Sequence, residues 1–168
     1  MMFFKKKSKL LKKEEEDEVL IIDIQSRILK IEKTMTVFSR MIFNGDYAGK
    51  DKTYGEIHKE FLEMKIKVNT ILDNIKEIMI LEEEVKDKIL INDKLFLNDK
   101  YSKINVIEEN IKETIAFLES QPSIQELKNT GLEKLKKLLF RISEALAKIK
   151  EDNKKLKEAY IAIEEKIL

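Results

Sequence analysis

The sequence predicts an all-α protein, an elongated antiparallel and coiled-coil-like helical bundle with four main helices and one short helix. Of its 168 residues 39% are charged and 43% are hydrophobic, a composition that suits solvated helices with apolar stripes. One proline and four glycines leave little to interrupt such helices. Apolar residues recur at alternating spacings of three and four, and no segment shows the period-two alternation of a strand.

The first 18 residues differ from the rest in charge. Residues 1–13 carry six lysines and no acid, and residues 14–18 are all acidic. The remaining 150 residues carry equal numbers of acidic and basic side chains. The sequence therefore predicts a basic-then-acidic tail over 1–18 and a single bundle over 19–168.

The tail combines apolar and basic side chains, which suits contact with an anionic membrane surface. The candidates for that contact are Phe3, Phe4, Lys5, Lys6, Lys7, Lys9, Leu10, Leu11, Lys12 and Lys13. The alternative is a disordered, solubilising tail, since the acidic run can neutralise the lysines within the chain. The neutral body offers no second basic patch, which disfavours nucleic-acid binding.

The helices are predicted from their stripes. The first, over 19–43, carries an unbroken stripe from Ile21 to Ile42 and ends at an Asn-Gly pair. The second, over 53–92, is interrupted only at Glu82. Two Asn-Asp pairs predict a reversal between 92 and 99.

After that reversal we predict a third helix over 98–120, whose stripe runs through Tyr101, Ile104 and Glu108. A short helix over 122–129 follows, opened by Pro122. The last helix, over 132–167, keeps its three-four spacing throughout and carries Asn153 in the stripe. Because the stripes are wider than a two-stranded coil needs, each helix is expected to touch two neighbours. Self-association remains open.

Three polar residues occupy stripe positions and are the candidate site residues. In a hairpin centred near residue 95, Glu82 and Glu108 would lie at one level and could hold a cation or share a proton. The alternative is a wet edge of the bundle. Asn153 is a candidate for setting register or oligomeric state, against simple exposure near a helix end.

The sequence offers little for catalysis. It contains no cysteine and one histidine, and the position three residues before His58 is Gly55, so the Glu-x-x-His pair of a di-iron bundle is missing. No phosphate-binding glycine motif occurs. No apolar run approaches the ~20 residues of a membrane helix. We therefore expect a protein that is not an enzyme, holds no cofactor, and is cytoplasmic or membrane-peripheral.

The N-terminal third resembles the PhoU-like phosphate-transport regulators. The residues that carry the resemblance are Phe3-Phe4-Lys5-Lys6-Lys7, Gly45-Asp46-Tyr47 and Glu56-Ile57-His58. The likeness implies a helical-bundle regulator near a membrane transporter. The paired acidic motifs that bind metal in that family are missing after His58, so no metal ligands are carried over.

Three functions follow as hypotheses. The first is a non-enzymatic helical scaffold or adaptor that contacts a protein partner or a second copy of itself. The second is a PhoU-like membrane-proximal regulator. The third is a carboxylate-lined, metal-binding bundle that uses Glu82 and Glu108.

Overall fold

The computed structural model describes residues 2–44, 50–84, 91–120 and 129–165, with side chains over 9–40, 55–84, 94–120 and 132–163. All of the described secondary structure is helical. The four helices are α1 (Met2–Asn44), α2 (Lys50–Glu84), α3 (Ile91–Ser120) and α4 (Asn129–Glu165). The predicted all-α class is confirmed.

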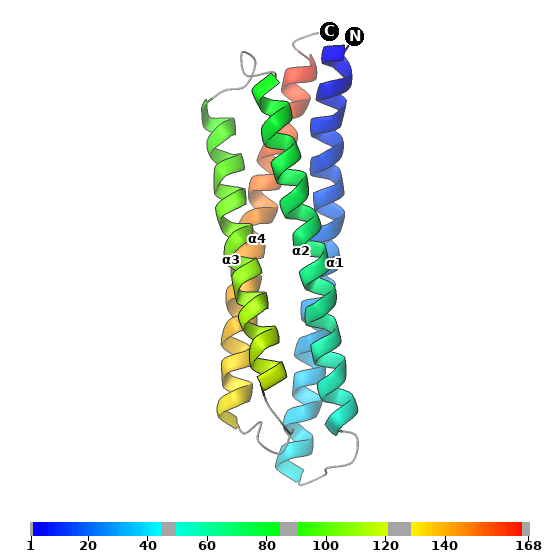
Figure 1. Ribbon diagram of the computed structural model, residues 1–168, viewed down its shortest axis with the longest axis vertical. Coiled ribbons are helices and arrows are strands. Elements are labelled where there is room, and N and C mark those ends of the chain that lie inside the picture. Colours follow the sequence, from blue (N-terminus) through cyan, green and yellow to red (C-terminus); the bar gives the residue numbers. More distant parts are fainter. Residues whose placement is uncertain (1, 45–49, 85–90, 121–128, 166–168) are drawn as a thin grey trace.

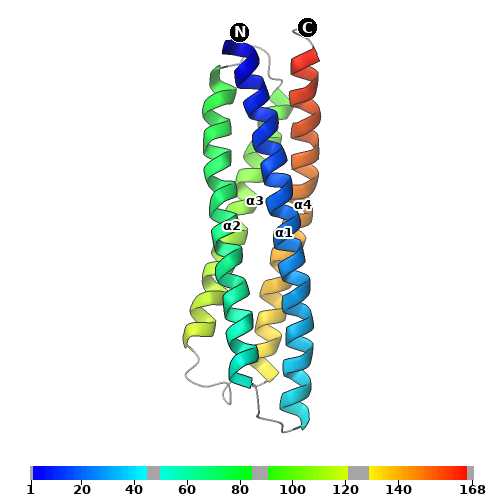
Figure 2. The same ribbon diagram turned by 90° about the vertical axis from the view of Figure 1, so that its right-hand side faces the viewer.

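The helices form an up-down-up-down bundle (Figure 1). Neighbours in sequence pack against each other, and α4 returns to pack against α1, which closes a ring of four. The residues next to the two chain ends lie at the same end of the bundle, as both views show (Figure 2). Each helix thus packs mainly against two neighbours, as the width of the stripes predicts.

The core consists of the stripes that the spacing predicts. In α4, buried residues continue from Leu132 through Leu146 and Leu156 to Ile163. The stripe of α2 is buried from Ile57 to Ile78. Burying branched and aromatic side chains of this size contributes ~1.5–3 kcal/mol each, and this burial is the main force that holds the helices together.

The first helix begins much earlier than predicted. It runs from Met2, whereas the sequence was expected to form a tail over 1–18 and a helix from 19. The three-four spacing continues backwards from Ile21 through Asp17, Glu14 and Leu10, and all four residues are buried. The acidic run is therefore part of a helix that packs in the bundle over at least two further turns.

The predicted reversal at 92–99 is wrong, because α3 is continuous from Ile91. The turn between α2 and α3 falls between Glu84 and Ile91. Asn and Asp at 92–93 and 98–99 are compatible with a helix when apolar residues on the opposite face pack in the core. The second helix accordingly ends at Glu84, before the predicted 92.

The buried face of α3 also has a different phase. Lys100, Ile107 and Thr114 are buried, whereas Tyr101 and Glu108 are only partly so. Leu97, Ile104, Ile111 and Leu118 belong to both versions of the stripe, so only the alternate positions were misassigned.

The predicted short helix over 122–129 lies outside the described residues, apart from Asn129 at the start of α4. The side chains of residues 1–8 are also outside the described part of the chain.

Candidate functional site: a buried polar layer and a surface groove

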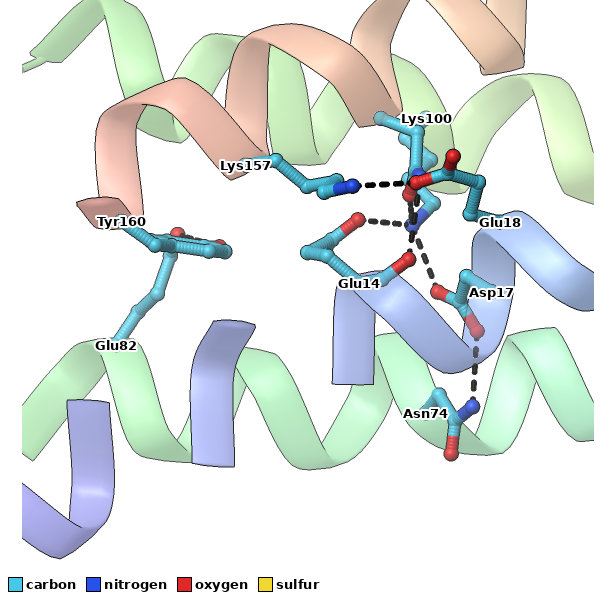
Figure 3. A network of polar contacts seen from close by, with 9 residues as sticks. Glu14, Asp17, Glu18, Asn74, Glu82, Lys100, Lys157 and Tyr160 are labelled. Atoms are coloured by element: carbon cyan, nitrogen blue, oxygen red, sulfur yellow. Dashed lines mark hydrogen bonds and ion pairs between the residues drawn. The ribbon is translucent and has the colours of Figure 1, made fainter. Parts of the chain in front are cut away.

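A layer of polar side chains crosses the core near the end of the bundle where the chain begins and ends (Figure 3). We call it the polar layer and define it by Glu14 and Asp17 of α1, Asn74 of α2, Lys100 of α3 and Asn153 of α4. Each of the four helices contributes to it, and each member is 8% exposed or less. These positions continue the apolar stripes, so the helices that bury isoleucine and leucine elsewhere bury charge here.

Lys100 is the centre of the layer. Its Nζ donates hydrogen bonds to Glu14 Oε2 at 2.7 Å, to Asp17 Oδ2 at 2.7 Å and to Asn153 Oδ1 at 2.8 Å. An ammonium group has three donors, and all three are used. Asn74 Nδ2 donates to Asp17 Oδ1 at 2.8 Å, and Asn153 Nδ2 donates to the backbone oxygen of Glu14 at 3.1 Å.

The layer is short of positive charge and of donors. One ammonium faces two buried carboxylates, and Glu14 Oε1 is buried without a hydrogen-bond partner. Burial raises the pKa of Glu14 to about 7, against the attraction of Lys100, and the neighbouring Asp17 carboxylate adds to the rise. Burial also raises the pKa of Asp17. The pKa of Lys100 is raised because its two carboxylates outweigh burial, so Lys100 keeps its charge.

The layer can therefore take up one proton near neutral pH. The protonated carboxyl would be neutral, and the remaining carboxylate would balance Lys100. Since the groups are held in a core with little access to water, this protonation is coupled to the stability of the fold.

A second buried contact lies beside the layer. Tyr160 Oη of α4 donates to Glu82 Oε1 of α2 at 2.6 Å, and both residues are buried. Glu82 also contributes to the raised pKa of Glu14 by charge repulsion. Lys13 and Lys157 extend the layer to the surface, through Glu77 at 2.9 Å and Glu18 at 2.5 Å respectively.

Replacing Tyr160 by Phe is expected to lower the free energy of unfolding by about 1–3 kcal/mol. The change removes one hydrogen bond from the buried carboxylate of Glu82 while keeping the ring in the core. Urea denaturation followed by circular dichroism measures the effect. Tyr101→Phe is the matched control, because Tyr101 is only partly buried. Equal, negligible losses in both variants would contradict the role given to the Tyr160 hydroxyl.

The structure does not bring the predicted carboxylate pair together. Glu82 lies near the end of α2 and bonds to Tyr160, whereas Glu108 lies 17 residues into α3 and pairs with Lys112 at 2.8 Å. With the turn between 84 and 91, the two positions differ by ~20 Å along the bundle axis, at ~1.5 Å per residue. Among the described residues, no group of three or more His, Cys, Asp or Glu side chains could hold a metal ion.

Asn153 is buried in the core, as one of its two predicted roles requires, and its partners come from α1 and α3. Sequence reasoning missed Glu14, Asp17, Asn74 and Lys100. His58 lies away from the polar layer and its Nε2 is 3.1 Å from Glu119 Oε1.

The candidates for membrane contact are partly committed to the bundle. Leu10 is fully buried and Leu11 packs against the core, so neither is free to enter a lipid headgroup region. Lys13 bonds to Asn74 and Glu77, while Lys9 and Lys12 are exposed. The side chains of Phe3, Phe4, Lys5, Lys6 and Lys7 lie outside the described set. Within the described part of the chain, no helix is long and apolar enough to span a membrane.

A groove follows the outer seam between α1 and α4, and we call it the α1–α4 groove (18–40 of α1 and 136–161 of α4). It contains one pocket of about 650 Å³ towards the end of α1 and another of about 370 Å³ beside the polar layer. Met35 and Leu139 lie in the larger pocket, where the Phe140 ring is 68% exposed. Asn153 links the polar layer to the smaller pocket.

Comparison with known proteins gives no relative for this chain: no protein-family model, curated protein or solved structure matches it.

Proposed function

We propose that this chain is a non-enzymatic helical adaptor that binds another protein along the α1–α4 groove. One observation carries the proposal: two pockets follow each other along the same helix pair, and a large aromatic side chain stands exposed at the larger of them. Exposed aromatic side chains beside concave surfaces are typical of sites where proteins bind one another.

The packing of the helices supports this proposal. The main apolar stripes are buried within the single chain, so a partner is not needed to complete the core. Apolar residues left on the outside are then available for recognition. A pair of adjacent helices with a groove between them is a common receptor for a further helix.

Site-specific crosslinking tests this function. A photoreactive phenylalanine derivative at position 140 is expected to give one discrete covalent adduct in an extract of the source cells. The same derivative at Ile66 of α2 is the control, because Ile66 is similarly exposed, at 58%, but lies on another helix. Adducts of equal yield at both positions, or none at position 140, would count against the groove as a binding site.

A further inference from the structure

The chemistry of the groove indicates which kind of partner fits it. We propose that the α1–α4 groove binds an acidic amphipathic helix of about 22 residues, which lies along the groove as a fifth helix. This inference rests on the proposed function and adds the chemical class of the partner. The length follows from the 22 residues between positions 18 and 40 of α1, at ~1.5 Å per residue for both helices.

An apolar line runs between the two pockets. Ile22 and Leu29 of α1 are 52% and 58% exposed. They follow Glu18 at spacings of four and seven residues, and Leu29 precedes Glu32 by three, so they share one face of α1 with pocket residues at both ends. On α4 the corresponding apolar residues are Phe140 and Ile161, which are 68% and 41% exposed. Apolar residues spaced in this way suit the apolar face of a second helix better than they suit an extended chain.

Cations border this apolar line. The pocket walls contain Arg40, Lys136, Lys150, Lys154 and Lys157 against the acids Glu18, Glu32 and Glu158. Lys157 and Glu18 pair with each other at 2.5 Å, and Lys136 lies 3.9 Å from Glu133 outside the pocket.

The free charge of the groove is therefore positive. Just outside the larger pocket, Lys137 and Arg141 add two cations against Glu144. A partner helix with acidic residues beside its apolar seam would complement these charges, whereas a basic helix would be repelled. The apolar line between the cations favours such a helix over a nucleic-acid backbone, which needs phosphate contacts alone.

Peptide binding tests the proposal on the full-length protein. The probe is a fluorescein-labelled 22-residue helix with leucines at three-four spacing and glutamates beside them. Two control peptides carry lysines in place of the glutamates or the same residues in scrambled order. Fluorescence anisotropy is expected to show binding of the acidic helix alone, weakened by added salt.

Charge reversal in the groove provides the matched variants. The pair Lys150→Glu and Lys154→Glu is expected to weaken binding of the acidic helix at least tenfold and to create binding of the lysine helix. Lys59→Glu with Lys76→Glu on α2 changes the net charge equally, and those lysines are exposed away from the groove. This control pair is expected to leave the affinity within twofold of the unchanged protein. The gain of lysine-helix binding separates a groove effect from misfolding.

Three outcomes would overturn the inference. The first is equal binding of the acidic and lysine helices, and the second is an equal loss of affinity in the two variant pairs. The third is a dimer in light scattering that Lys150→Glu with Lys154→Glu dissociates, which would make a second copy the occupant. If no acidic helix binds while the crosslink at position 140 persists, the adaptor function stands and only the partner's chemistry is wrong.

Discussion

Replacing Lys100 by Met is expected to lower the free energy of unfolding by about 3–5 kcal/mol at pH 8. The variant keeps a side chain of similar length but leaves Glu14 and Asp17 buried without their shared cation. Removing one partner of a buried ion pair is costly because the remaining charge can neither be hydrated nor be paired. Since native domains are stable by only ~5–15 kcal/mol, the loss is a large part of the total.

Urea denaturation followed by circular dichroism measures this loss. Lys148→Met is the matched control, because Lys148 is exposed on α4, and its effect is expected to stay within about 0.5 kcal/mol. Adding Glu14→Gln and Asp17→Asn to Lys100→Met is expected to recover most of the lost stability, because the unpaired charges are then gone. A triple variant as unstable as Lys100→Met alone would show that packing, and not charge, causes the loss.

Replacing Glu14 by Gln is expected to change how stability depends on pH. Burial raises the pKa of Glu14 from 4.5 to about 7. Between these values the folded chain holds a proton that the unfolded chain has lost. Raising the pH removes that proton, so the contribution of Glu14 is fully present below pH 4.5 and is lost as the pH rises through 7. At ~1.4 kcal/mol per pH unit, the loss amounts to about 3 kcal/mol.

Glutamine cannot ionise, so the variant should lack this part of the pH dependence. Its stability is expected to match that of the unchanged protein near pH 4.5 and to exceed it by about 3 kcal/mol above pH 7. Urea denaturation at intervals from pH 4.5 to 8.5 measures the difference, with Glu15→Gln as the exposed control next in sequence. Asp17, whose pKa is also raised, keeps its own contribution in both proteins, so the difference isolates Glu14. Parallel curves for the variant and the unchanged protein would refute the assignment.

Spacing alone predicted most of the fold. The helical class and the stripes of α2 and α4 are in place because an uninterrupted three-four repeat has few other ways to bury its apolar side chains. The start of α1 was missed because the count stopped at the acidic run. Extending it upstream would have placed Asp17, Glu14 and Leu10 on the buried face.

The polar layer was harder to foresee. In α3, Leu97, Ile104 and Ile111 fit two stripes, and the choice of Tyr101 and Glu108 as the alternate positions hid Lys100. Ile107, in phase with Lys100 at a spacing of seven, was the available signal. Even with the correct phase, which cation meets which carboxylate depends on the level at which the helices pack, and that level depends on turns whose position the sequence left open.

Closure of the α1–α4 seam has a consequence for the order of folding. The contacts of Asn153 with Glu14 and of Lys157 with Glu18 join residues 139 apart in sequence, whereas the other helix pairs are neighbours along the chain. Bringing together such distant segments costs the most chain entropy, so this seam is expected to form last. The groove between α1 and α4 then exists only in the completed bundle, and a partner that recognises it would discriminate between finished and unfinished molecules.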